Sequence, residues 1–282
     1  MNRRALLAAL PAATLAACSP LRAFSTLAPR DPARAGPLDV PYGPHPRQRM
    51  DIYRPRQPEG PSPILVFFYG GNWDSGRRQD YGWVGHALAA QGFVTAIPDY
   101  RLVPEVHYPA FVEDGARSVA ALRGLASSLG ADADRLAVSG HSAGAYIAAM
   151  LALQPDYLAA AGTPPVQAFA GLAGPYDFHP FDVPAAVAAF GKAPDPAATQ
   201  PVNLALERAP PVFLAHGDSD ELVQPRNSRS LAGKLAAAGA DVEFKLYPEL
   251  DHKDLVLTLS RPFRGRAPVL EDMSGFLRSR LA

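Results

Sequence analysis

The stretch Ser139-Gly140-His141-Ser142-Ala143-Gly144 lies between an apolar run, 136–138, and a run of small residues at helical spacing, 145–153. A strand that turns at once into a helix strains the backbone of its turn residue and pushes that side chain out at the end of the sheet. Gly140 and Gly144 lack the Cβ atoms that would clash where the two elements approach closely. The pattern predicts that Ser142 presents a nucleophilic hydroxyl at a helix N-terminus, where developing negative charge is favoured. A capping serine in a tight glycine-rich turn is the alternative.

The composition bounds the domain count and the partners. The chain has 282 residues, which suits one domain with a sizeable core once a targeting segment is set aside. Its 27 Lys and Arg residues balance 27 Asp and Glu residues, so the net charge is zero. This balance gives no reason to expect nucleic acid or a strongly anionic surface as a partner. The single cysteine, Cys18, excludes an internal disulfide.

The N-terminus has the features of an export signal. Arg3 and Arg4 precede an apolar stretch, 5–17, which is shorter than the about 20 residues that a membrane-spanning helix needs. The stretch ends in Leu15-Ala16-Ala17-Cys18, which resembles the lipobox of bacterial lipoproteins. We therefore expect residues 1–17 to be a signal peptide and Cys18 to carry a lipid.

Lipidation of Cys18 implies export and a lipid anchor in the cell envelope. Ser19 after the cysteine points to the outer membrane if the host is Gram-negative. The alternatives are an ordinary signal peptide with an incidental cysteine, or an apolar N-terminal helix. The pair Arg3-Arg4 also resembles the start of a twin-arginine signal, so the export route stays open.

Residues 18–37 have no periodicity and contain four prolines among Ala, Arg and Ser. This composition predicts a flexible tether. At about 3.3–3.6 Å per residue, it would let the domain stand up to roughly 60 Å from a membrane. The folded domain is then expected over 38–282.

Apolar runs alternate with helical patterns along the rest of the chain. Run 64–69 is continuously apolar, as a strand buried on both faces of a parallel sheet is, and run 48–53 alternates like a strand near a sheet edge. Further strands are expected at 93–97, 166–172, 212–215 and 242–247, and helices at 81–91, 110–128, 227–238 and around 269–277. We expect an α/β fold with a mainly parallel sheet, helices on both faces, and a ligand site outside the carboxyl ends of the strands.

Residues 175–206 break this alternation and are rich in proline. We expect an insertion that lies over the strand ends and forms one wall of a pocket. A surface excursion that does not contact the substrate is the alternative.

A nucleophilic serine needs a base to take its proton and an acid to orient that base. Of the seven histidines, His252 is the best placed, because it follows the last buried strand at its carboxyl end. Asp220 lies one turn beyond strand 212–215, after Gly217, and Asp218 is the runner-up for the acid. The alternatives are a solvated loop histidine and a solvated acidic turn. Ser142, Asp220 and His252 follow the order of α/β-hydrolases.

Acyl transfer also needs backbone N–H groups aimed at the oxygen that becomes negative. One donor is expected at Ala143, directly after the nucleophile. The second donor is expected from Gly71 and Asn72, which follow strand 64–69. The pair Gly70 and Gly71 permits the unusual backbone that this requires. A simple Gly-Gly turn is the alternative. Contacts with the substrate are expected from Trp73, Phe178 and Phe181.

From Tyr42 to His252 the chain resembles α/β-hydrolases of the carboxylesterase and lipase group, including hormone-sensitive-lipase-like esterases. The resemblance is carried by stretches 48–55, 69–73, 99–102, 140–144 and 216–220. In such families the aspartate that closes a His-Gly-x-x-Asp run is the triad acid, which implies Asp220. The family loop is usually His-Gly-Gly-Gly, whereas Tyr69 and Asn72 stand at its first and last positions here. This loop, followed by Trp73, is also similar to that of kynurenine formamidases.

Together these features predict a serine hydrolase that cleaves carboxylic esters of small uncharged substrates through an acyl-enzyme. No metal or cofactor is implied, and apolar residues around the site favour a short to medium acyl group. One alternative is an aryl-formamidase or amidase with the same triad. A peptidase is disfavoured because related peptidases usually carry a further domain. A non-catalytic envelope binding protein of the same fold is the remaining alternative, and nothing in the sequence indicates an oligomeric state.

Overall fold

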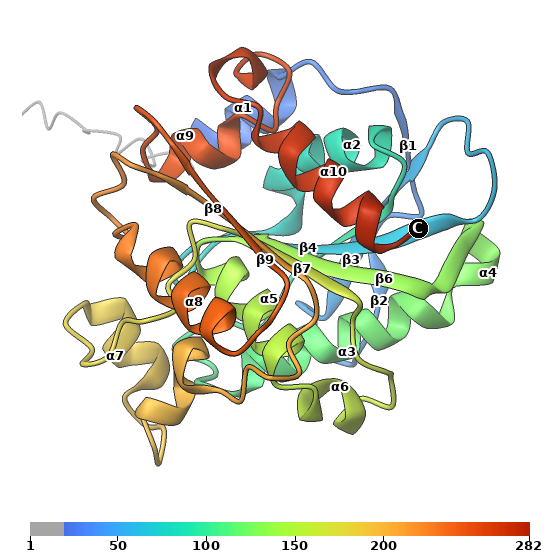
Figure 1. The fold of residues 1–282 in the computed structure, drawn as a ribbon. Coiled ribbons are helices and arrows are strands. Elements are labelled where there is room, and N and C mark those ends of the chain that lie inside the picture. The colour runs from blue at the N-terminus through green and yellow to red at the C-terminus, as the bar shows by residue number, and fades with distance from the viewer. Residues whose placement is uncertain (1–19) are drawn as a thin grey trace, which may run out of the picture.

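The structure of the protein is a computed structural model that describes residues 20–282 (Figure 1). The expected signal peptide, 1–17, and the expected lipidation site, Cys18, lie outside the described residues. Within residues 20–282, no helix is long and apolar enough to cross a membrane.

A nine-stranded sheet runs through the described part of the chain, with strands in the order β1-β3-β5-β4-β6-β7-β8-β9, and β2 paired with β3. The pairs from β5 through β4 to β9 are all parallel, and β3 runs antiparallel to β5. The sheet is therefore mainly parallel, as predicted. The strands are β1 (Ala33–Ala35), β2 (Val40–Pro41), β3 (Arg49–Pro55), β4 (Ser62–Phe68), β5 (Val94–Pro98), β6 (Ala131–His141), β7 (Ala168–Leu172), β8 (Val212–Gly217) and β9 (Val242–Tyr247).

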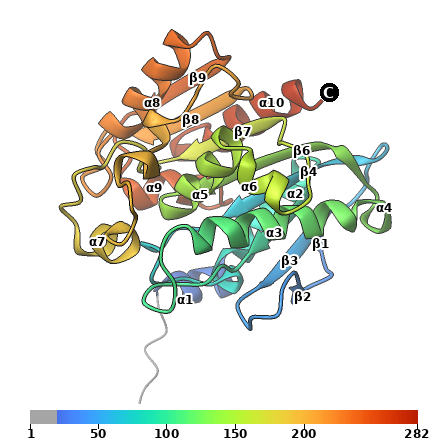
Figure 2. The ribbon, with the colours of Figure 1, turned by 90° about the horizontal axis from the view of Figure 1, so that it is seen from below.

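Helices cover both faces of this sheet, with α1, α2, α9 and α10 on one side and α3, α5, α6 and α8 on the other (Figures 1 and 2). Because both faces are covered, the central strands are mainly apolar where they cross the core; all of β5 and β7 is buried. The helices are α1 (Pro20–Leu27), α2 (Gly82–Ala90), α3 (Ala110–Gly124), α4 (Ala126–Leu129), α5 (Ala143–Leu153), α6 (Asp156–Ala160), α7 (Pro184–Phe190), α8 (Arg226–Ala237), α9 (His252–Leu257) and α10 (Val269–Arg280), with 3₁₀ turns η1 (Arg78–Tyr81), η2 (Ala197–Thr199), η3 (Pro201–Asn203) and η4 (Arg264–Arg266).

The expectation of a flexible tether over 18–37 is wrong from Pro20 onward. Residues 20–27 form α1, and Phe24 packs edge to face on Trp83 and against Phe263, with ring centroids 5.4 and 5.9 Å apart. Residues 33–35 form β1, which pairs with β3. Leu21, Phe24 and Ala28 recur at helical spacing, and this short apolar face holds the segment against the domain.

A buried arginine ties the first strands together. Arg78, on η1, is paired with Asp51 of β3 at 3.0 Å and with Asp99, just after β5, at 2.5 Å. It also pairs with Asp39. Tyr69 donates its hydroxyl hydrogen to Asp99 at 2.7 Å. Tyr69, at the position where the family loop usually has a histidine, is thus held by Asp99 at the start of the loop that follows β4.

Candidate active site

The turn between β6 and α5 has the strained form that the sequence predicts. Ser142 lies between the two elements with φ 56° and ψ −126°, and its N–H donates to the carbonyl of Leu172 at 2.9 Å. A Cβ at Gly144 would collide with the carbonyl of Phe68, and one at Gly140 with the backbone of Gly144. Only glycine fits at these two positions, because β4, β6 and α5 meet there.

The structure brings Asp220 and His252 together. Asp220 lies in the turn after β8, and His252 is the first residue of α9, whose N-terminus is capped by Asp251. The carboxylate oxygen Oδ2 of Asp220 lies 2.7 Å from Nδ1 of His252. Asp218 instead accepts hydrogen bonds from the N–H of Glu249 and the hydroxyl of Ser219. Asp220, and not the runner-up Asp218, therefore orients the histidine.

Asp220 is held in its ionised form. Its other oxygen, Oδ1, accepts the backbone N–H groups of Leu222 and Val223 at 3.0 and 2.9 Å. Burial by itself would raise the pKa of Asp220, but hydrogen bonds from His216, His252 and Val223 outweigh it and hold that pKa far below its ordinary value. A charged carboxylate is the form that can accept a hydrogen bond from the N–H at Nδ1 of His252.

A second histidine, His216, shares this carboxylate, and the sequence reasoning set it aside. Its Nε2 lies 2.6 Å from the carbonyl of Val223 and 3.2 Å from Oδ2 of Asp220. Because a carbonyl can only accept, Nε2 carries the hydrogen, and Nδ1 accepts from the hydroxyl of Ser228 at 2.8 Å. The spacing of four residues between His216 and Asp220 is the signal that could have revealed this contact.

His141, next to Ser142, contacts His252. Its Nε2 donates to the backbone carbonyl of His252 at 2.9 Å, and the two imidazole rings lie 4.7 Å apart. Burial, and then the nearby His252, lower the pKa of His141 to about 3, so its ring is neutral at pH 7. The neutral ring holds the backbone of His252 through this hydrogen bond without placing a positive charge beside it.

The loop after β4 turns through three consecutive residues with positive φ: Gly71 at 135°, Asn72 at 53° and Trp73 at 60°. For a non-glycine residue, this backbone conformation costs on the order of 1–2 kcal/mol of conformational free energy. Asn72 and Trp73 therefore both hold a strained backbone. The loop closes on itself because the N–H groups of Asp74 and Ser75 both donate to the carbonyl of Gly71 at 3.0 Å.

A cavity of about 280 Å³ lies between this loop and Ser142. Asn72, Trp73, Ser142 and Ala143 all line it, and Gly71 directly precedes the lining residue Asn72. The insertion forms the opposite wall, as predicted; its lining residues are Pro175, Phe178, Asp182, Val183, Ala185 and Ala186.

Aromatic side chains form part of the cavity wall. Trp73 stacks on Phe178 with centroids 6.0 Å apart and meets Phe190 edge to face at 4.8 Å. Phe178 lines the cavity, and Phe181 packs behind it at 5.7 Å. Two of the three residues expected to contact substrate therefore reach the cavity directly, and Phe181 supports them.

The BD-FAE family model matches residues 50–235, which include the loop after β4, the turn at Ser142 and the aspartate turn. The chain belongs to the BD-FAE family. Two curated relatives are each 30% identical to this chain. They are a probable isoprenylcysteine alpha-carbonyl methylesterase of Oryza sativa, matched over 82% of this chain and 61% of the relative, and the esterase LipC of Mycobacterium tuberculosis, matched over 70% and 54%. The BD-FAE chain thus spans little more than half the length of these relatives.

Solved structures share the fold of this chain. A truncated carbohydrate esterase from gut microbiota superposes with a TM-score of 0.75 at 20% identity, covering 88% of this chain and 96% of the other. Esterase B of Lactobacillus rhamnosis superposes with the same TM-score and identity, over 92% and 90%. The predicted α/β-hydrolase fold is confirmed.

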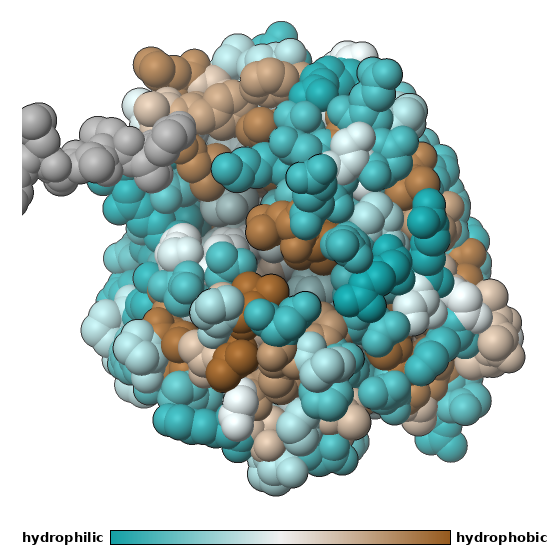
Figure 3. Space-filling view, turned by 90° about the vertical axis from the view of Figure 1, so that its left-hand side faces the viewer, coloured by the Kyte–Doolittle hydropathy of each residue, from teal (hydrophilic) through white to brown (hydrophobic). Residues whose placement is uncertain are grey.

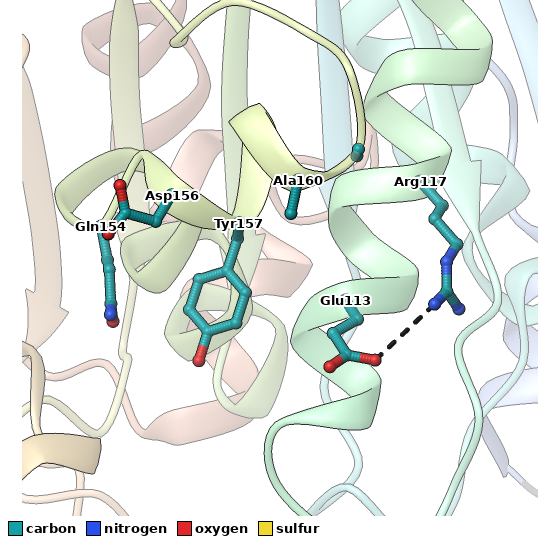
Figure 4. Close-up of a pocket in the computed structure, with 7 residues that line it drawn as sticks. Glu113, Arg117, Gln154, Asp156, Tyr157 and Ala160 are labelled. Carbon is teal, nitrogen blue, oxygen red and sulfur yellow. Dashed lines mark ion pairs between the residues drawn. The ribbon is translucent and has the colours of Figure 1, made fainter.

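A second cavity in the BD-FAE chain, of about 450 Å³, lies between α3 and α6 (Figure 4). On α3, Nη2 of Arg117 lies 3.7 Å from Oε2 of Glu113, and Tyr157 and Ala160 of α6 also line the cavity. No serine, histidine or cysteine is among its lining residues, so this cavity does not hold a triad of the Ser-His-Asp kind. In residues 20–282, no group of three His, Cys, Asp or Glu side chains is placed to hold a metal ion.

Proposed function

We propose that the protein is a serine carboxylesterase in which Ser142, His252 and Asp220 form the catalytic triad. The observation that carries this proposal is the 2.7 Å contact between Asp220 and His252 at the end of the sheet where Ser142 stands in a strained turn and lines a cavity. A buried acid that orients a histidine, at the same end of the sheet as a serine that lines a cavity, is the set of groups needed to activate a hydroxyl group.

In the proposed mechanism the hydroxyl of Ser142 attacks the ester carbonyl, and Nε2 of His252 takes its proton. His252 then returns the proton to the departing alcohol, and water hydrolyses the acyl-enzyme by the same steps in reverse. Asp220 keeps the hydrogen of His252 on Nδ1 and stabilises the imidazolium that forms. The N–H groups of Ala143, Gly71 and Asn72 receive the negative oxygen.

The cavity supports a small, uncharged acyl group as the part of the substrate next to Ser142. Its volume of about 280 Å³ is at the lower end for small-molecule sites, and Trp73 and Phe178 are among its lining residues. We expect acetyl to hexanoyl esters to react and long-chain esters to react poorly. Hydrolysis of long chains alone would contradict this.

The test is hydrolysis of p-nitrophenyl butyrate by the full chain and by Ser142→Ala. Ser139→Ala is the matched control, because Ser139 is a buried serine on β6, the strand that leads to Ser142, and does not line the cavity. We expect Ser142→Ala to lose at least about a thousandfold in kcat and Ser139→Ala to keep wild-type activity. Equal activity in all three proteins would refute the triad. A larger kcat/KM for the matching aryl formamide would make the protein a formamidase.

We further propose that the protein is exported and carries a lipid on Cys18, on the outer membrane if the host is Gram-negative. The lipobox-like stretch 15–18 supports this. Labelling cells with radioactive palmitate should mark the wild-type chain and leave Cys18→Ala unmarked. Equal labelling of both proteins would refute the lipid site.

A further inference from the structure

Helix α7, in the insertion, is apolar on its exposed side. Its sequence, Pro184 to Phe190, contains only Pro, Ala, Val and Phe. Ala186, Ala189 and Phe190 are buried, while Val187 is 51% exposed and Pro184 and Ala188 are also exposed. A surface helix normally turns polar residues outward, and a helix that is apolar all round is normally buried. The outer side of α7 therefore lacks a partner among the described residues.

This apolar side continues to the mouth of the active-site cavity. Val183, directly before α7, is 51% exposed, and Leu222, in the turn after Asp220, is 62% exposed. Both line the cavity that contains Ser142. We call Val183, Val187 and Leu222 the apolar rim. The face of the molecule that carries the strand ends is hollowed and shows brown, apolar areas beside the hollow (Figure 3).

The proposed lipid anchor would hold the same side of the molecule at a membrane. Only Ser19 separates Cys18 from α1, a reach of roughly 7 Å. Helix α1 is fixed to the domain through Phe24, and Ser25 donates to the carbonyl of Gln79 at 2.9 Å. Figure 1 shows α1 and α7 on the left-hand side, above and below the sheet. A lipid on Cys18 would thus bring the apolar rim close to the bilayer.

The charges beside the rim indicate which lipid surface fits. Asp182, Glu221 and Arg226 line the same cavity and are exposed, so acidic and basic groups are mixed there. A surface that binds anionic lipids gathers several lysines or arginines. The rim therefore suits an uncharged or zwitterionic surface.

We propose that the apolar rim rests on a zwitterionic lipid surface, and that the enzyme takes from it esters with a short acyl group and a lipid-embedded alcohol portion. The acyl group enters the cavity at Ser142, and the alcohol portion lies along Val183 and Val187. This inference rests on the proposed esterase function and on the proposed lipid on Cys18.

The first test measures contact with lipid and does not depend on activity. A fluorophore is attached at Val187→Cys in the full lipidated chain, whose only native cysteine is blocked by its lipid, and the protein is reconstituted on phosphatidylcholine vesicles. Leu38→Cys is the matched control, because Leu38 is 54% exposed and lies between β1 and β2. We expect spin-labelled lipid to quench the probe at position 187 at least threefold more than the probe at position 38. Equal quenching overturns the proposal.

The second test compares two butyrate esters, soluble p-nitrophenyl butyrate and hexadecyl butyrate held in the vesicles. We expect Val187→Asp to lower the vesicle-borne rate at least fivefold and the soluble rate less than twofold, and Leu38→Asp to change neither. Equal loss of rate on both esters overturns the proposal. It is also overturned if the wild-type protein is a dimer and Val187→Asp dissociates this dimer without lowering the rate on the vesicle-borne ester. If wild type hydrolyses neither ester but position 187 is quenched, the esterase function fails and the lipid contact stands.

Discussion

Replacing Asp220 by asparagine tests the acid of the proposed triad at the level of single atoms. Oδ1 of Asp220 accepts two backbone N–H groups, from Leu222 and Val223. In Asp220→Asn the one remaining carbonyl oxygen has to stay with these two donors. The amide nitrogen then takes the place of Oδ2, 2.7 Å from Nδ1 of His252. Two donors would face each other unless His252 moves its hydrogen to Nε2.

That move removes the acceptor that Ser142 needs, because Nε2 of His252 would already carry a hydrogen. The same substitution in a serine protease triad lowers kcat by about 10⁴. We expect a similar loss here, which corresponds to about 5.4 kcal/mol of transition-state stabilisation at 1.36 kcal/mol per tenfold. The assay is kcat for p-nitrophenyl butyrate, with thermal unfolding of each variant as a check on folding.

Asp218→Asn is the matched control, since it changes an exposed carboxylate two residues away that does not contact His252. We expect its kcat to stay within threefold of wild type. The reasoning would be refuted by a folded Asp220→Asn that keeps more than a tenth of wild-type kcat. A thousandfold loss in Asp218→Asn would assign the acid to Asp218.

Three further outcomes are expected. Gly144→Ala should fail to fold or lose several kcal/mol, because its Cβ meets the carbonyl of Phe68, while Gly124→Ala, which meets no atom within 4 Å, should be as stable as wild type; thermal unfolding measures both. Arg78→Leu should cost about 3–5 kcal/mol in urea unfolding, since it removes the arginine paired with the buried Asp51 and leaves the buried Asp99 only the more distant Arg47, and a loss below 1 kcal/mol would contradict this. The neutral His141 should destabilise the protein as pH falls. Its folded pKa of about 3 lies below the unfolded value of about 6.5, so the unfolded chain binds more protons, and its contribution is lost by up to about 1.4 kcal/mol per pH unit from pH 6.5 down toward 3. Urea titrations from pH 7 to 4 should therefore be flatter for His141→Gln, and parallel curves would contradict the assignment.

The parts of the fold that the sequence predicts are those with one dominant local cause. The buried strands are predictable from continuous apolar runs, since both faces of the sheet are covered; β7, at 168–172, lies within the expected run 166–172 and is buried throughout. The turn at Ser142 is predictable because two glycines are the only residues that fit where three elements meet. Asp220 follows from its place after a strand end.

The parts that the sequence does not predict depend on contacts between distant segments. Helix α1 has only two turns of apolar spacing, and its stability comes from Trp83 and Phe263, which lie far along the chain. His216 could be placed at a strand end, but its hydrogen bond to Val223 depends on how the aspartate turn folds back. The contact of His141 with the carbonyl of His252 joins residues 111 positions apart.

The pairing of β1 with β3 also bears on how molecules of this protein meet one another. Without β1, the backbone groups of β3 that face it would be free, and such an edge is a template for strands of other chains. Three residues cap this edge, and a strand as short as β1 offers little backbone with which a further strand could pair. At the opposite edge, Glu243 and Lys245 place charges along β9. A chain begun at Leu38, after β1, would uncover the first edge and should therefore self-associate through its sheet.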